Sequence, residues 1–97
     1  MKLETLNKKL KGFVNVQNMC SITTGKEVPN QYILTYTNGK VFKSYGSIIV
    51  IKYDDKVYLT KKWNYSVTTG KYRNQFLGEG IKETKEKLTK GIYKIVS

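Results

Sequence analysis

The stretch "QYILTYTNGKVFKSYG", residues 31–46, carries the strongest local folding pattern in the chain. Two runs rich in β-branched and aromatic residues flank Asn38-Gly39, a dipeptide that favours the type I′ turn of a two-residue β-hairpin. With that turn, Tyr36 would lie opposite Val41. The sequence therefore predicts an antiparallel hairpin over residues 31–45.

Further strands are predicted on both sides of this hairpin. The run "SIIVI", residues 47–51, is apolar at consecutive positions after its serine, which suits a central strand buried on both faces. Asp54 and Asp55 then favour a turn, so residues 47–60 form a second strand pair. The runs "FVNVQNMCSI" and "IYKIV" have the composition of strands as well. We expect a meander-like antiparallel sheet of about four to six strands.

Two or three short helices are expected around this sheet, over residues 3–11, 68–77 and 80–89. In the first, Leu3, Leu6 and Leu10 form one apolar stripe, which should pack on the sheet or on a partner subunit. The second has a hydroxyl residue at its start and Gly78 at its end. The third would be supported by the ion pairs Lys82–Glu86 and Glu83–Lys87 at i,i+4 spacing. The chain is thus predicted to be a single small α+β domain, residues 1–97, with its helices packed on one side or at one end of the sheet.

The charge of the chain restricts its partners. Lysine and arginine number 18 against 7 acidic residues, a net charge of +11, which favours association with nucleic acid, a nucleoprotein or an acidic protein surface. Because all but one of these cations are lysines, the excess can also reflect an AT-rich genome. No apolar run approaches the roughly 20 residues of a membrane span. The N-terminal residues lack the apolar core of a secretory signal, so we expect a soluble intracellular protein.

The residue types that most enzymes use are scarce. The chain has no histidine and a single cysteine, which excludes intramolecular disulfides, Cys/His zinc sites and Ser-His or Cys-His catalysis. Cys20 is interpreted as a small core residue. Asp54 and Asp55 are expected in a turn, and Glu79, Glu83 and Glu86 on an exposed helix face, so no metal or acid–base site is predicted. We therefore expect a non-enzymatic protein with no cofactor and no metal.

The best candidate for a binding site is the segment "WNYSVTTGKYRNQFLGEG", residues 63–80, together with the two lysines before it. Exposed rings can stack on bases, and a helix N-terminus favours an anion. The predicted contact residues have basic, hydroxyl or aromatic side chains: Lys61, Lys62, Tyr65, Ser66, Thr68, Thr69, Lys71, Tyr72 and Arg73.

Within this segment Trp63 and Phe76 are expected in the core, with Lys71 and Arg73 projecting into solvent. Arg73, the only arginine, offers two-pronged recognition of a phosphate or carboxylate. The alternative interpretation is structural. In it the hydroxyls cap the helix and Arg73 forms a solvated salt bridge.

The run from residue 45 to residue 80 resembles a small domain family of tailed phages and mobile elements of low-GC bacteria. The resemblance rests on the pattern W-x-Y-S-x-T-T-x-K-(Y/H) followed by F-L-G-E, matched here by Trp63, Tyr65, Ser66, Thr68, Thr69, Lys71, Tyr72, Phe76, Leu77, Gly78 and Glu79. The family has no settled activity. The resemblance implies a phage setting and action in the host cell cytoplasm, and residues 1–29 lie outside it.

Three hypotheses follow from these patterns. The first is a phage accessory protein that binds nucleic acid or a nucleoprotein machine, for example an inhibitor of a host defence nuclease. The second is a protein that binds an acidic host protein surface without contacting nucleic acid. The third is a small ligand-sensing domain or enzyme that uses the hydroxyl-rich turn. The sequence leaves the oligomeric state and the identity of the partner open.

Overall fold

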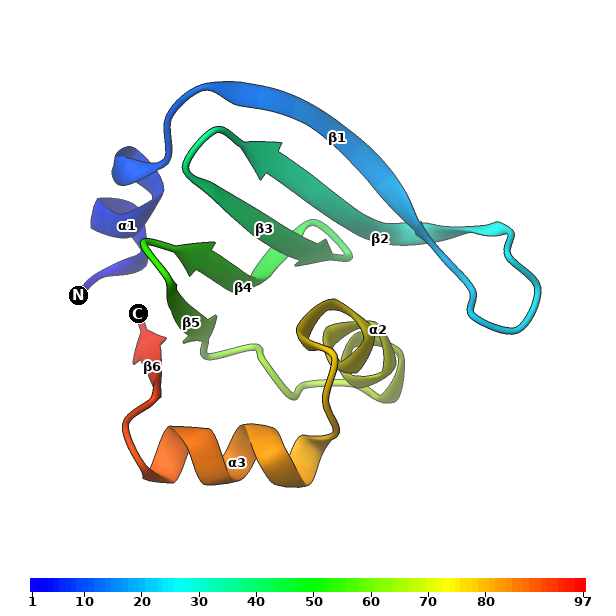
Figure 1. Ribbon diagram of the computed structural model, residues 1–97. Helices are drawn as coiled ribbons and strands as arrows, with labels where there is room; N and C mark the ends of the chain where they lie inside the picture. The colour runs from blue at the N-terminus through cyan, green and yellow to red at the C-terminus, as the bar shows by residue number, and fades with distance from the viewer.

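The computed structural model describes residues 1–97 and has an α+β fold with a six-stranded sheet and three helices (Figure 1). The elements follow the chain in this order: α1 (Leu3–Lys9), β1 (Phe13–Cys20), β2 (Glu27–Tyr36), β3 (Gly39–Ser44), β4 (Ser47–Tyr53), β5 (Lys56–Thr60), α2 (Val67–Leu77), α3 (Ile81–Thr89) and β6 (Tyr93–Val96). No helix has both the length and the apolar character needed to cross a lipid bilayer.

The strands lie side by side in the order in which they occur in the chain. The first five pair antiparallel, as the predicted meander requires, whereas β6 pairs parallel to β5. Two parallel neighbours need a connection that crosses from one end of the sheet to the other, and α2 and α3 provide it. The sheet is therefore mixed, and mostly antiparallel.

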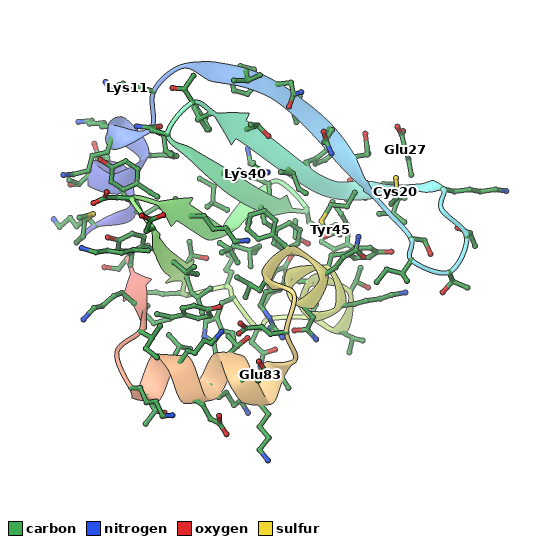
Figure 2. The ribbon with its side chains drawn as sticks, in the orientation of Figure 1. Lys11, Cys20, Glu27, Lys40, Tyr45 and Glu83 are labelled. Carbon is green, nitrogen blue, oxygen red and sulfur yellow. The ribbon has the colours of Figure 1, made fainter.

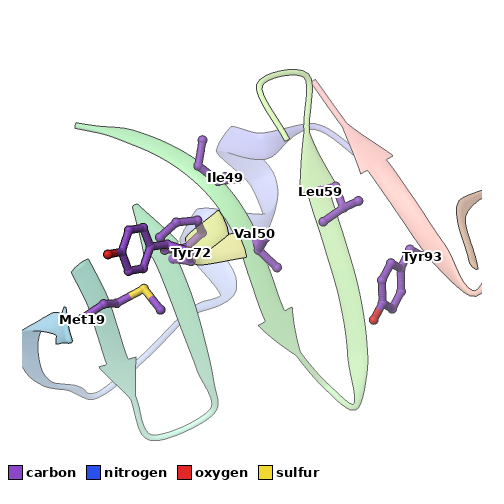
Figure 3. Close-up of a cluster of buried hydrophobic side chains, with 7 residues drawn as sticks. Met19, Ile49, Val50, Leu59, Tyr72 and Tyr93 are labelled. Carbon is purple, nitrogen blue, oxygen red and sulfur yellow. The ribbon is translucent and has the colours of Figure 1, made fainter. Parts of the chain in front are cut away.

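One face of the sheet packs against α2 and α3. The cluster on this face contains Phe42, Val50 and Leu59 from three neighbouring strands and Tyr72 from α2 (Figure 3). Phe76 and Leu88, from the two helices, pack against it.

The other face packs against α1. Val41, adjacent to Phe42 in the chain, belongs to this second cluster together with Leu6, Leu10 and Ile51. Leu6 and Leu10 are 0% and 6% exposed, which confirms that the leucine stripe of the first helix is buried on the sheet. The expectation that all helices pack on one side or end is not met, because strands that are apolar on both faces need cover on both.

The hairpin of residues 31–45 forms, but its turn differs from the predicted one. Tyr36 pairs with Gly39 and Leu34 with Val41, so the two turn residues are Thr37 and Asn38. The predicted Asn38-Gly39 turn is therefore wrong by one residue, and the predicted pairing of Tyr36 with Val41 is wrong by two.

Contacts with the segment before β1 explain this register. The Asn38 side chain accepts a hydrogen bond from the Lys11 N–H at 2.9 Å and donates one to the Lys9 carbonyl at 2.8 Å. Gly39 lies against the backbone carbonyl of Lys52 and the side chain of Leu10, where a Cβ atom would have no room. A glycine is thus required at this position because β4 and Leu10 lie so close to it, and not because its backbone is left-handed.

Most other local predictions agree with the structure. Asp54 and Asp55 form the β4–β5 turn with φ angles of 55° and 58°. Ile49 and Ile51 are fully buried within the sheet. Cys20, however, is exposed and is not a core residue, because Met19 takes the inward position at the end of β1.

The close approach at Gly39 leads to a stability prediction. Gly39→Ala should lower the free energy of unfolding by about 1–3 kcal/mol, because the methyl group must displace the Leu10 side chain or the β4 backbone. Urea denaturation followed by circular dichroism would measure this loss.

Gly70→Ala in α2 is the matched control. Its Cβ would meet only the Arg73 guanidinium at 3.7 Å, an ordinary contact, and alanine favours the helix by up to about 1 kcal/mol. Equal effects of the two substitutions would contradict the role given to the Gly39 contact.

Candidate anion-binding site

The nine residues predicted to form a contact surface do not share one surface. Thr69, Tyr72 and Arg73 are buried, at 0%, 5% and 1% exposure. Ser66 is half-buried, and the remaining five are exposed: Lys61, Lys62, Tyr65, Thr68 and Lys71. The structure therefore separates structural residues from residues that can reach a ligand.

The hydroxyl groups at the start of α2 cap and anchor this helix. Ser66 is its N-cap residue, and its Oγ accepts a hydrogen bond from the Thr69 N–H at 3.1 Å. The Thr69 hydroxyl in turn lies 2.8 Å from the hydroxyl of Ser44 on β3. These contacts support the structural interpretation of the two hydroxyls.

Arg73 does not project into solvent as expected. One of its terminal nitrogens donates to the Trp63 carbonyl at 2.8 Å and to the Asn64 side chain at 3.1 Å. The other donates to the Asn74 side chain at 2.8 Å, and the guanidinium lies 5.2 Å from the centre of the Trp63 ring. Burial lowers the pKa of Arg73, an effect that the Glu79 carboxylate partly opposes.

These contacts explain why an arginine stands at this position. A guanidinium can donate several hydrogen bonds in fixed directions, whereas an ammonium group is a single point of charge. Arg73 thereby fastens the loop after β5 to α2. It is a buried structural cation and cannot contact a ligand at the surface.

Glu79 is also buried, against the expectation of an exposed helix face. Its side chain is 3% exposed and accepts hydrogen bonds from Lys87 Nζ at 2.6 Å, Tyr93 Oη at 2.7 Å and Thr84 Oγ1 at 2.7 Å. Burial raises the pKa of Glu79, but these hydrogen bonds together outweigh it, and the net pKa lies below its ordinary value. Lys87 pairs with Glu79 and not with Glu83, so the predicted helical pairs do not form.

Three lysines gather at another place on the surface, Lys61 and Lys62 exposed and Lys43 half-buried. A hollow of about 430 Å³ opens at the ends of β3 and β5 and the start of β4. We call it the basic hollow, and its lining residues are Leu3, Lys43, Gly46, Ser47, Ile48, Thr60, Lys61, Lys62, Val96 and Ser97. No residue of α2 lines it, and neither does any Asp or Glu.

Two exposed tyrosines neighbour lining residues of the basic hollow, although neither tyrosine lines it. The Nζ atom of Lys62 donates to the Ser47 hydroxyl at 3.1 Å and lies 5.9 Å from the centre of the Tyr65 ring, which is 48% exposed. Tyr45 precedes the lining residue Gly46 in the β3–β4 turn, where Figure 2 labels it, and is 51% exposed. The site thus combines ammonium groups, hydroxyls and accessible aromatic rings.

Of the predicted contact residues, Lys61, Lys62 and Tyr65 lie at this site, whereas Lys43, Tyr45 and Ser47 were not in that set. The local pattern that could have found them is "KSYGS", residues 43–47. There a tyrosine and a glycine form a two-residue turn, since Ser44 pairs with Ser47. Such a turn brings the side chains on its two sides to the same end of the sheet.

A larger hollow, of about 620 Å³, lies between the β2–β3 and β4–β5 turns. Lys40, Lys52 and Lys56 line it, but so do Asp54 and Asp55. Burial and the neighbouring Lys40 lower the pKa of Lys52, an effect that Glu79 partly opposes. Because carboxylates share this surface, it is less suited to an anion than the basic hollow.

Residues 1–94 match the model of a family of unknown function, DUF8033. No curated protein and no solved structure matches the chain. The family match includes the N-terminal helix and the first strand, which lie outside the segment that carries the phage-domain resemblance.

The contacts of Arg73 predict a loss of stability on its removal. Arg73→Ala should lower the free energy of unfolding by about 2–3 kcal/mol, because three charge-assisted hydrogen bonds disappear and their acceptors are partly buried. Lys71→Ala, on the exposed side of the same helix, should change it by less than about 0.5 kcal/mol. Thermal unfolding of both variants would check this, and a wild-type midpoint for Arg73→Ala would refute it.

The environment of Glu79 predicts a dependence of stability on pH. Because its pKa is lower in the folded than in the unfolded chain, the ionised form stabilises the fold above the unfolded pKa, about 4.3. This contribution is lost as the pH falls through the folded pKa. Glu79→Gln should therefore be less stable than wild type at pH 6, and the difference should shrink towards pH 2.

Glu83→Gln is the control for this titration, since Glu83 is exposed and forms no ion pair. It should retain the acid profile of the wild type. Denaturation curves from about pH 2 to pH 7 would measure all three proteins. A constant difference between wild type and Glu79→Gln over that range would show that the carboxylate charge is not what stabilises the fold.

Proposed function

Since the chain belongs to DUF8033, a family of unknown function, we propose its function from its own surface: it is a non-enzymatic protein that binds single-stranded nucleic acid in the basic hollow. The observation that carries this proposal is the combination of three lysines, Lys43, Lys61 and Lys62, with two exposed tyrosines and no carboxylate side chain in the lining. Ammonium groups neutralise phosphates, and accessible rings stack on unpaired bases.

The charges of this site are free to act on a ligand. Only two of the 18 basic residues form ion pairs with carboxylates, Lys8 with Glu4 and Lys87 with Glu79. None of the three lysines of the hollow is paired with a carboxylate side chain. Lys62 is already held towards the site by the Ser47 hydroxyl, which reduces the freedom that it loses on binding.

The size of the site favours an unpaired strand. A volume of about 430 Å³ is within the range of small-ligand pockets, about 300–1,000 Å³, and suits one or two nucleotides. Reading a duplex usually requires a helix or a β-ribbon that enters a groove. The basic hollow is concave and offers neither.

The cellular setting remains part of the proposal. We place the protein in the host cell cytoplasm as a phage accessory protein that acts on nucleic acid or on a nucleoprotein machine, such as a host defence nuclease. The resemblance of residues 45–80 to phage domains and the net charge of +11 support this setting. A nuclease that holds a single strand would present both the phosphates and the bases that this site fits.

A second candidate function is binding to an acidic protein surface. The outer side of α3 carries Lys82, Lys85 and Lys90, with one carboxylate, Glu86, around a shallow hollow of about 280 Å³ that contains no hydrophobic residue. Without aromatic rings this surface cannot stack on bases, but it can contact carboxylates. It therefore favours a protein partner over a nucleic acid.

A paired charge deletion distinguishes the two surfaces. The double variant Lys61→Ala/Lys62→Ala should bind a fluorescent oligothymidine more weakly and reduce the slope of log K against log salt by about 1–1.5, since each phosphate contact on a single strand contributes about 0.7. Fluorescence anisotropy at several salt concentrations measures both quantities. Tyr65→Leu should weaken binding without changing the slope.

The matched control is Lys82→Ala/Lys85→Ala, which removes the same charge from α3. It should leave oligothymidine binding close to wild type. If instead the α3 variant loses affinity and the Lys61/Lys62 variant does not, the nucleic-acid site is misplaced. Equal affinity of the wild type for oligothymidine and for polyglutamate would favour the acidic-protein hypothesis.

A further inference from the structure

The sheet has two edge strands, and only one of them carries a charged side chain. Exposed edges are normally blunted by charged side chains or by short strands, because their unpaired N–H and C=O groups attract other strands. β6 has four residues and contains Lys94. β1 has eight residues, FVNVQNMC, and is the only strand without a charged residue. It runs along the outer rim of the sheet, with β2 on its inner side (Figure 1).

Apolar side chains are exposed along this uncharged strand. Phe13, Val14 and Val16 are 57%, 57% and 55% exposed. The Phe13 ring contacts Tyr36 of β2 edge-on, with 5.5 Å between the ring centres, so the apolar surface continues onto the neighbouring strand. An apolar patch beside an unpaired strand edge marks a surface at which another polypeptide strand binds.

The charge distribution identifies a second copy of the chain as the occupant. Two copies with a net charge of +11 repel each other wherever their lysines meet, and residues 12–25 contain no charged side chain. Lys11 lies at one end of β1, and Cys20 and Glu27 lie at the other (Figure 2). An antiparallel pair of β1 strands therefore keeps the two Lys11 residues at opposite ends. An acidic partner would gain no attraction from this uncharged strand and would bind the lysine-rich surfaces instead.

We propose that the protein forms a twofold-symmetric dimer in which β1 pairs antiparallel with β1 of a second copy, joining the two sheets into one. Such an interface is self-complementary, as twofold symmetry requires. The pairing of β1 with β2 is irregular between Phe13 and Asn15 and between Asn18 and Cys20. Regular strand geometry is thus confined to Asn15–Asn18, and the twofold axis passes through this segment.

The first test is the mass of the protein in solution, measured by sedimentation equilibrium over a range of concentrations. The wild type should have twice the chain mass of 11.2 kDa, and Val16→Lys should be monomeric because it brings two ammonium groups together near the axis. Ile95→Lys is the matched control, since it places a lysine at a 45% exposed residue of β6, the opposite edge, and should remain dimeric. Circular dichroism checks that each variant is folded.

A cysteine scan gives a second and independent readout. In a Cys20→Ser background, single cysteines are introduced at each position from Asn15 to Asn18 and oxidised. In a twofold antiparallel pair one residue lies opposite its own copy, so one of these positions should cross-link far faster than its neighbours. Positions such as Val14 and Cys20, away from the axis, should not cross-link.

Three results would overturn the proposal. They are a monomeric wild type at high concentration, a dimer that survives Val16→Lys, and cross-linking that is equally slow at every position from 15 to 18. If the wild type were monomeric but formed a stable complex with an extended peptide of another protein, the partner of β1 would be that protein and not a second copy. This test does not depend on nucleic-acid binding, so its failure would leave the proposed function of the basic hollow unaffected.

Discussion

The burial of β4 on both faces is the constraint on which the rest of the structure depends. Ile49, Val50 and Ile51 are each 0% exposed, and burying such side chains stabilises a fold by about 1.5–3 kcal/mol each. A strand of this kind needs a strand on each side and a layer of side chains on each face. The neighbouring strands are β3 and β5. The covering side chains come from α1 on one face and from α2 and α3 on the other. The start of β4 also supplies Ser47 and Ile48 to the basic hollow, so the site depends on the same strand.

The sequence correctly predicted those parts of the fold that depend on residues close together in the chain. The aspartates of the β4–β5 turn, the hydroxyl cap of α2 and the apolar run of β4 each act through their near neighbours, and the structure confirms them. The Asn38-Gly39 turn failed because both residues are used by distant segments, Asn38 by the residues before β1 and Gly39 by β4. The resulting error of two residues in the strand register did not move side chains to the opposite face of the sheet, because side chains alternate with a period of two. The parallel addition of β6 also depends on how two helices pack, which no local pattern reveals.

The candidate site was predicted only in part, because two charged residues of the predicted segment are buried. The rule that charged side chains stay at the surface placed Arg73 and Glu79 in solvent, yet both are buried with several hydrogen-bond partners. Those partners come from the loop before α2, from α3 and from β6, so the rule fails where distant segments supply them. Several residues that carry the resemblance to phage domains, including Trp63, Ser66 and Glu79, hold this joint between strand and helix together. In this chain these residues of the pattern therefore have structural roles.

Tyr45 connects the local strain of the fold with its proposed use. Four residues other than glycine have a positive φ angle, and three of them, Asn30, Asp54 and Asp55, are of the types that tolerate it. Tyr45, at 51°, is not, and a left-handed backbone costs a residue with a Cβ roughly 1–2 kcal/mol. Its ring is half exposed and belongs to neither hydrophobic cluster, so core packing does not offset that cost. The hairpin offsets it instead, because Tyr45 and Gly46, with φ angles of 51° and 79°, form the two-residue β3–β4 turn, and the Tyr45 N–H donates to the Asn30 carbonyl at 2.9 Å. The backbone conformation thus has a structural reason, and the exposed ring remains available for the stacking that we propose.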